Sequence, residues 1–472
     1  MHLDNQTKFT MPIELTMKTL DPHVSPRPGA RQQTGRLAIA ALISFATGLS
    51  ACSDRPEVGT IGYVNGFVGA VTGDEPRSVL VARDILSAGG TAADAAVATA
   101  LALTVTYPLS ASIGGGGVCI VHDHAAKMTE TLEFYPGQTK GSATAHPTAV
   151  PGLPRGLFAL HAKYGHLRWE RLVTPAENLA RFGDTTSRSL ADALAAEGAG
   201  LGLDAEARRV FVSADGFTLG EGVTIKQMDL AETLSRLRIR GPGDFYAGAL
   251  ANDLVTAVAA VGGSLTTEDL HDYMPRWVAT TEASFGTAAA HFAPAPADGA
   301  TAAAMWSAMK GMDEKQPQVP ANTSAPIAPA AGVSATGFAV VDREGSAVAC
   351  TLTMNAPFGS RRVASGTGVL LALPPGNAPY PTPMLVVKRN VNEVTYAATA
   401  TGNASAAASL TRVASQAVLQ GQSLAQAVMA SAPGRVNAIA CLEGLPPFPK
   451  SCHVVTDPKG FGMALVINDG EP

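Results

Sequence analysis

Residues 334–355, "SATGFAVVDREGSAVACTLTMN", constrain the fold more than any other part of the chain. Small and apolar residues alternate from Ala335 to Val341, a turn follows at 342–345, and a second alternating run comes after it. A period of two is typical of a β-strand with one buried face, so the sequence predicts a β-hairpin here. A buried hairpin of this kind needs a sheet around it.

The segment before this hairpin is unlike it. Residues 313–333 are rich in Pro and Ala and have no periodicity, which predicts a linker. The linker leads directly into the strand, and hydroxyl residues stand at the junction. Ser334 and Thr336 are therefore both candidate nucleophiles.

The first 52 residues read as a targeting segment. Three arginines precede the apolar run "LAIAALISFATG", and "LSAC" follows and ends at Cys52. This order is typical of a secretory signal, and the apolar run is too short to span a bilayer. "LSAC" is similar to a bacterial lipobox, which predicts lipidation of Cys52 and a membrane anchor through that lipid. Ser53 rather than Asp follows, which favours the outer membrane for a periplasm-facing lipoprotein. An ordinary signal peptide with a chance cysteine, and a true start at Met17, stay open.

The amino-acid composition limits the classes of molecule that the chain is expected to bind. The chain is 46% hydrophobic and 15% charged, with a net charge of −5, so it can bury a large core and has no basic surface for nucleic acid. Without CxxC or HExxH we expect no metal, and we expect no cofactor.

The four remaining cysteines fall into two pairs by context. Cys441 and Cys452 bracket a Pro-rich loop, and we expect them to form a disulfide. Cys119 and Cys350 lie in apolar, strand-like runs, and we expect buried, inert thiols.

Strand-like runs stand at both ends of the chain with helical patterns between them. A strand at 66–71 and two helices at 78–86 and about 92–106 come first, and residues 150–310 read as largely helical. More strands and two helices follow the hairpin. This order predicts a layered α+β fold rather than a doubly wound sheet.

Several runs together resemble the γ-glutamyltranspeptidase family of N-terminal-nucleophile hydrolases. They are "ILSAGGTAADAAVATALALTV", "SIGGGGVCIV", "AVPGLPRGLFALHAKYG", "MDLAETLSRL", "FYAGALANDLV", "GGSLTTEDLHDY", "FAVVDREGSAVACTLTMN", "FGS" and "GTGVLL". The resemblance implies a four-layer αββα sandwich, with a large-subunit-like part at 53–312 and a small-subunit-like part at 334–472. It also implies self-cleavage before a threonine, whose hydroxyl then attacks γ-glutamyl amides such as glutathione.

When the hairpin is aligned with the sequence that the resemblance implies, an alanine falls at the position of the nucleophile. With Phe338 and the Val340–Asp342 run as anchors, Ala335 stands where the family has its catalytic threonine, and Thr336 matches the next threonine. Thr336 could replace it only through a bulge at Gly337, because a shift of one residue turns a side chain to the other face.

Other positions of the family's site differ as well. Tyr135 stands where the resemblance implies a carboxylate-binding arginine, and Pro379 and Tyr380 stand where it implies two serines. Asn403 and Ala404 match the Gly-Gly pair that stabilises the oxyanion. Two positions keep the residue types that the resemblance implies: Thr353 matches a threonine that bonds the nucleophile, and Asn355 matches an asparagine that contacts the glutamate amino group. Both residues also have a purely structural interpretation, as a β-branched strand residue and a turn residue.

We therefore expect an exported member of the family without γ-glutamyl transferase or hydrolase activity, which acts in binding or as a structural protein. The alternative is a self-cleaving amide hydrolase or γ-glutamyl transferase that uses Thr336 with Thr353 and Asn355. A long helical segment of the family is reduced here to the linker, which could expose a new surface.

Overall fold

The computed structural model describes residues 66–141, 145–309, 334–402, 405–430, 435–458 and 460–469, which belong to one compact unit. Cys52, the targeting segment and the linker at 313–333 lie outside the described residues. None of the helices within the described ranges is long and apolar enough to cross a bilayer.

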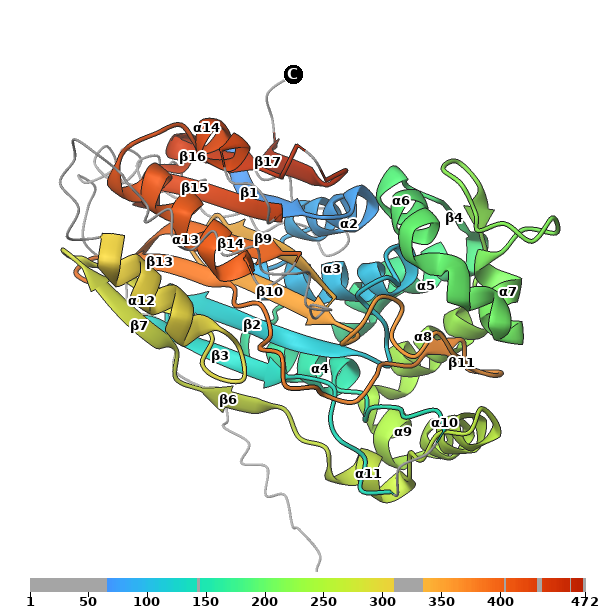
Figure 1. Ribbon diagram of the computed structural model, residues 1–472. Coiled ribbons are helices and arrows are strands. Elements are labelled where there is room, and N and C mark those ends of the chain that lie inside the picture. The colour runs from blue at the N-terminus through green and yellow to red at the C-terminus, as the bar shows by residue number, and fades with distance from the viewer. Residues whose placement is uncertain are drawn as a thin grey trace, which may run out of the picture. The chain divides into compact units, whose positions relative to one another are not determined.

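Two antiparallel sheets form the centre of the fold (Figure 1). The first has the strand order β17-β1-β9-β10-β2-β3-β6, and the second β16-β15-β14-β13-β8-β7. The strands of the first sheet are β1 Gly66–Gly73, β2 Gly116–Asp123, β3 Met128–Phe134, β6 Arg276–Val278, β9 Ala335–Asp342, β10 Ala347–Thr353 and β17 Met463–Asp469. Those of the second are β7 Thr281–Phe285, β8 Ala288–Phe292, β13 Met384–Lys388, β14 Glu393–Thr401, β15 Arg435–Leu445 and β16 Cys452–Val455. Two-stranded pairs lie outside them, β4 Asp184–Thr185 with β5 Thr224–Ile225 and β11 Val363–Ala364 with β12 Val369–Leu370.

Helices cover the outer face of each sheet. The first sheet packs against α2 Pro76–Ser87, α3 Ala92–Thr106 and α4 Leu153–Tyr164, and the second against α12 Gly299–Met309, α13 Ala406–Ala414 and α14 Leu424–Met429. Behind the first group, α5 Trp169–Phe182 packs on α3, and α8 Met228–Arg240 packs on α5. The remaining helices are α6 Arg188–Glu197, α7 Ala205–Phe211, α9 Pro242–Ala247, α10 Ala249–Ala260 and α11 Thr267–Asp272. The predicted α+β sandwich with layers αββα is confirmed.

Helix α3 shows why the sequence folds this way. A capping box joins Thr91 and Asp94 at its start, which satisfies two backbone N–H groups that would otherwise lack partners. All of its residues are buried, in agreement with its apolar character on every side. The helix therefore lies inside the layer that covers β9 and β10.

The two parts of the chain are interleaved in both sheets. In the first sheet β1 pairs with β9 and β2 pairs with β10, and in the second β8 pairs with β13. Residues 66–292 and 335–469 thus build one fold together. The outer face of the second sheet is buried under α12, α13 and α14, with Trp306 and Tyr396 among its fully buried side chains.

The expectation of a largely helical stretch at 150–310 is wrong for residues 276–292. Strands β6, β7 and β8 lie there, and β8 is central enough to pair on both sides. Its sequence, Ala288–Phe292, consists mainly of alanine, which has little preference for a strand by itself. The neighbouring strands fix its conformation through backbone hydrogen bonds.

Both cysteine pairs form disulfides. The predicted bond between Cys441 and Cys452 is confirmed, with an S–S distance of 2.07 Å. The expectation of free thiols at Cys119 and Cys350 is wrong: the two sulfur atoms are 2.03 Å apart, because β2 and β10 are neighbours and place these residues directly opposite each other. Two disulfides indicate an oxidising, extracytoplasmic compartment.

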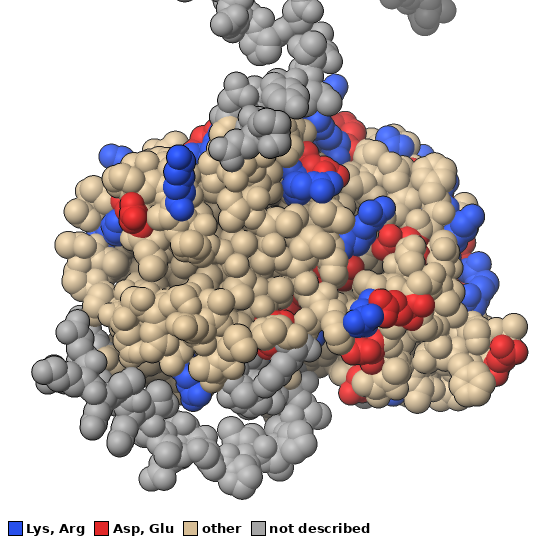
Figure 2. Space-filling view, turned by 90° about the horizontal axis from the view of Figure 1, so that it is seen from above, with Lys and Arg blue, Asp and Glu red and all other residues tan. Residues whose placement is uncertain are grey.

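Charged side chains are sparse on the face shown in Figure 2, where a broad central area has no Lys, Arg, Asp or Glu. Several acidic and basic side chains of the described residues form ion pairs. Arg209, for example, contacts both Glu206 and Asp229. This face has no continuous basic area of the kind that binds phosphate backbones.

Candidate functional site

The site that the sequence singles out lies where β9 begins and β10 ends. Ala335 pairs directly with Thr353, and the register continues without a shift to the pair of Val341 and Ala347. Ala339 and Val341 belong to the core between the two sheets. Because side chains alternate along a strand, Ala335 and Thr353 also face the second sheet.

Thr353 is held in one orientation by its neighbours. Its hydroxyl donates to the carbonyl oxygen of Ser334 at 2.6 Å and accepts from the backbone N–H of Asn355 at 2.9 Å. The carbonyl that accepts belongs to the peptide bond between Ser334 and Ala335. The Ser334 hydroxyl lies 2.7 Å from that of Ser110, and the two share a hydrogen bond. A hydroxyl therefore polarises the carbonyl just before Ala335, but Ala335 itself carries only a methyl group.

Thr336 lies on the other face of β9. It is fully buried and pairs with Leu352, which belongs to the core between the first sheet and its helices. Its hydroxyl donates to the carboxylate of Asp74 at 3.0 Å. The bulge at Gly337 that would turn Thr336 toward the second sheet is absent, since β9 keeps its register with β10 through residues 335–341.

Asp74 is the centre of a buried polar cluster that the sequence did not reveal. Besides Thr336, it accepts hydrogen bonds from the N–H of Gly337 at 3.1 Å and from the side-chain amide of Asn437 at 2.8 Å. The Thr401 hydroxyl adds a fourth donor at 3.3 Å. Its negative charge raises the pKa of Arg435. These donors come from both sheets, so the carboxylate ties the start of β9 to β14 and β15.

Tyr135 and Tyr380 lie face to face. Their rings are stacked with centroids 4.2 Å apart and an angle of 18° between the planes. Burial raises the pKa of both hydroxyls. Neither hydroxyl has a hydrogen-bond partner among the described residues, and the same holds for Oδ1 of Asn355. The Asn355 side chain also acts on the Tyr380 hydroxyl and lowers its pKa, against the larger effect of burial.

A pocket of about 470 Å³ opens beside this stacked pair. Tyr135 and Tyr380 line it together with Tyr273, whose hydroxyl donates to the carbonyl of Tyr135 at 2.8 Å. Glu133 and Arg276 also line the pocket, and Nη2 of Arg276 donates to Oε2 of Glu133 at 2.6 Å. The pocket wall therefore consists largely of tyrosine, proline and glycine residues, with one ion pair at its edge.

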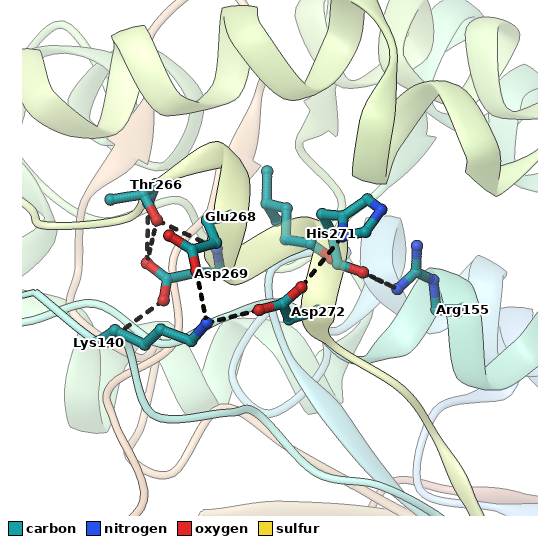
Figure 3. A network of polar contacts seen from close by, with 8 residues as sticks. Lys140, Arg155, Thr266, Glu268, Asp269, His271 and Asp272 are labelled. Atoms are coloured by element: carbon teal, nitrogen blue, oxygen red, sulfur yellow. Dashed lines mark hydrogen bonds and ion pairs between the residues drawn. The ribbon is translucent and has the colours of Figure 1, made fainter.

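A polar network surrounds helix α11, which ends just before Tyr273 (Figure 3). Lys140 lies between Glu268 and Asp272, with Nζ–O distances of 3.1 and 2.5 Å. Arg155 donates to the backbone carbonyls of His271, at 3.1 Å, and of Tyr273. These contacts fix helix α11 and the turn after it, which carries Tyr273 into the pocket.

The remaining candidate positions add nothing to this geometry. Asn403 and Ala404 lie outside the described residues. Among the residues that the structure describes, no three His, Cys, Asp or Glu side chains are grouped as metal ligands.

The family model described as gamma-glutamyltranspeptidase matches residues 78–328 and 315–374. The glutathione hydrolase proenzyme of Escherichia coli (strain K12) is 27% identical over 421 residues, which cover 71% of this chain and 72% of that protein. The corresponding proenzyme of Pseudomonas aeruginosa is 30% identical over 386 residues, covering 64% of this chain and 67% of that protein.

Other relatives are matched over a smaller share of their length. Scoloptoxin SSD14 of Scolopendra dehaani is 31% identical over 220 residues, and the match spans 38% of that protein. Among solved structures, a cephalosporin acylase from Bacillus halodurans superposes with a TM-score of 0.69 at 20% identity, covering 90% of this chain and all of that one. This likeness concerns the fold.

Proposed function

This chain belongs to the gamma-glutamyltranspeptidase family, and we propose that it is a member that neither cleaves itself nor transfers γ-glutamyl groups. In this proposal the retained fold serves in binding or as a structural protein of the cell envelope. The observation that carries it is the position of Ala335, opposite Thr353 and one bond after the polarised carbonyl of Ser334.

The chemistry of self-cleavage explains why the residue at position 335 determines whether the chain can cleave itself. A hydroxyl at the first residue of β9 would add to the carbonyl carbon of Ser334, and the amide nitrogen would leave to give an ester that water hydrolyses. Without cleavage, β9 also has no free amine that could act as the base. The methyl group of Ala335 cannot attack the carbonyl carbon, and the uncleaved chain has no free amine at this position.

The substrate side of the site supports the same proposal. A γ-glutamyl group carries a free carboxylate and an ammonium group, which need charged partners when they leave water. Tyr135 and Tyr380 offer neutral rings at these positions, and Arg276 is already paired with Glu133.

A second candidate uses Thr336 as the nucleophile of an amide hydrolase or γ-glutamyl transferase. Its supporting observation is the hydrogen bond from the Thr336 hydroxyl to Asp74, because a carboxylate next to a hydroxyl can act as a base. That carboxylate accepts three further hydrogen bonds, and Thr336 is fully buried on the face away from Ala335. These contacts favour a structural role for the pair.

We also propose that the mature protein is anchored in the outer membrane by a lipid at Cys52, with the folded part in the periplasm. The lipobox-like "LSAC" and the signal-like run before it support this anchor. The two disulfides fit such a location. Radiolabelled palmitate incorporation that is lost in Cys52→Ala would test the anchor.

The proposal on activity is tested with γ-glutamyl-p-nitroanilide, with and without an amino acceptor. We expect no nitroaniline above the level of the heat-denatured protein, with the E. coli enzyme as the positive control. Turnover that is lost in Thr336→Val and kept in the wild type would instead establish the second candidate.

A further inference from the structure

We propose that the pocket beside Tyr135 and Tyr273 binds a small carboxylic acid that has a flat ring and no ammonium group. The ring lies against the tyrosine wall, and the carboxylate pairs with Arg276 at the edge of the pocket. The inference rests on the proposed function, since it assumes that the pocket no longer receives a γ-glutamyl group. The pocket volume of about 470 Å³ lies within the range of small-molecule sites in proteins.

The alternation of strand β3 places a charged pair and an aromatic ring next to each other in this pocket. Glu133 and Tyr135 line it, whereas Phe134 between them belongs to the core under the helices. Arg276 of the neighbouring strand β6 is the direct partner of Glu133. Successive side chains on one face of a strand are about 7 Å apart, so a ring and a carboxylate joined by a short spacer can reach both groups.

The wall of the pocket favours a flat ring. Tyr135 and Tyr273 line it and are partly exposed, and Tyr380 stacks on Tyr135 with ring centroids 4.2 Å apart. Proline rings such as those of Pro136 and Pro379 also line it. A flat ring gains both from the burial of apolar area against such a wall and from stacking on the tyrosine π-systems.

Arg276 supplies a cation that a ligand can reach without breaking the existing ion pair. Its Nη2 donates to Oε2 of Glu133 at 2.6 Å, while the Arg276 side chain remains 67% exposed. A guanidinium has five N–H donors in a planar fork, so it can hold two carboxylates at once. Glu133, which is 3% exposed, keeps its partner. The ligand carboxylate stays in contact with water at the edge of the pocket, whereas that of a γ-glutamyl group would be buried against neutral rings.

The same ion pair disfavours an ammonium group. Arg276 and Glu133 are the charged residues among those that line the pocket, and the Glu133 carboxylate is buried and already paired. An ammonium group would lie near the guanidinium and would lose water without gaining a carboxylate. The pocket therefore favours the acid over the corresponding amino acid.

Three compounds of similar shape test this charge requirement. They are 3-phenylpropionate, its neutral amide 3-phenylpropionamide, and L-phenylalanine, which is the same acid with an ammonium group added. Ligand-observed NMR with the folded ectodomain at neutral pH measures all three. We expect saturation transfer to the ring protons of the acid and a Kd on the order of 0.1–1 mM. The amide and phenylalanine should bind about fivefold more weakly.

Variants of the charged pair test the role of Arg276. Glu133→Gln removes the competing carboxylate, so it should tighten binding of the acid about threefold. Glu133→Gln combined with Arg276→Gln removes both charges, leaves no buried charge without a partner, and should bind the acid no better than the amide. Arg389→Gln is the matched control, because Arg389 is 48% exposed and pairs with Glu282 at 2.6 Å but does not line the pocket. It should leave the affinity for the acid unchanged.

Two glycine variants locate the binding. Gly376 lines the pocket, and a Cβ there meets no atom within 4 Å, so Gly376→Trp introduces a large ring at the pocket without a backbone clash. Gly220 is equally open but does not line the pocket, and Gly220→Trp is the matched control. We expect Gly376→Trp to abolish detectable binding of the acid at unchanged melting temperature, and Gly220→Trp to leave binding unchanged.

The outcomes separate this inference from the proposed function. Equal affinities for the three compounds, or no binding of the acid at about ten times the upper end of the expected Kd range, overturn the inference. An unchanged affinity for the acid in the double variant or in Gly376→Trp overturns it as well. Self-cleavage is read separately, from the mass of the chain, and its appearance would overturn the proposed function without altering any of these binding results.

Discussion

Ala335 and Thr353 lie directly opposite each other across strands β9 and β10. Thr353 keeps its hydroxyl on the carbonyl oxygen that precedes Ala335. The pair therefore retains the group that polarises a carbonyl while lacking the group that would attack it. The proposed absence of self-cleavage therefore depends on the Ala335 side chain, and replacing that residue tests it.

Ala335→Thr should restore part of the self-cleavage. The new hydroxyl would lie on the face of β9 that carries Ala335, next to the carbonyl of Ser334 and opposite Thr353. We expect a fraction of the chain to split between residues 334 and 335 over hours to days, seen by mass spectrometry. Ala335→Val has nearly the same shape without a hydroxyl and should stay intact. Equal cleavage in both variants, or none in either, would contradict this account of the site.

The tyrosine hydroxyls should differ in their effect on stability. Tyr380→Phe removes a buried hydroxyl without a hydrogen bond, and we expect the free energy of unfolding to stay the same or rise by about 1 kcal/mol. Tyr273→Phe removes the donor to the Tyr135 carbonyl, and we expect a fall of about 1 kcal/mol. Urea unfolding followed by fluorescence measures both. A clear loss of stability in Tyr380→Phe would mean that its hydroxyl has a partner.

All four cysteines of the fold should be unreactive until they are reduced. Under denaturing but non-reducing conditions, a maleimide should leave Cys119, Cys350, Cys441 and Cys452 unlabelled, and after reduction it should label each of them. Replacing Cys119 and Cys350 together by alanine should lower the free energy of unfolding by roughly 2–5 kcal/mol. Labelling of Cys119 without reduction would show that this bond does not form.

Stability should fall as the pH rises from about 4 to 7. Burial raises the pKa of Asp342 from its ordinary value of 3.8 to about 7, although the N–H of Ala92 donates to it. The folded state then binds this proton more tightly than the unfolded chain, so it holds more protons within that window and loses stability as they leave. For this one group the loss is roughly 2–4 kcal/mol.

Asp342→Asn provides the control for that dependence, because the amide has no proton to lose in this range. Unfolding free energies measured from pH 4.5 to 8 should fall less steeply in the variant than in the wild type. Parallel curves for the two proteins would assign the pH dependence to other groups, of which Asp298, with a pKa raised by burial to about 6, is the first to examine.

The hairpin could be predicted because its signals are local. The alternation from Ala335 to Val341 and the turn after it are contained in a few residues, and the structure has a strand, a turn and a strand there.

The rest of the site depends on contacts between distant parts of the chain. Tyr135 and Tyr380 stack although 245 positions separate them, and no local pattern announces such a contact. Cys119 and Cys350 meet only because β2 and β10 became neighbours. Asp74 looks in the sequence like one more acid before a helix, yet it gathers donors from both sheets. Sequence spacing carries none of this information, because strand order decides it.

The most direct test of the central claim is the intact mass of the ectodomain from Ser53 onward, purified and then incubated for days at neutral pH. The account predicts a single chain of unchanged mass, because Ala335 offers no hydroxyl to the carbonyl of Ser334. Two fragments that divide between Ala335 and Thr336 would contradict it and make Thr336 the nucleophile.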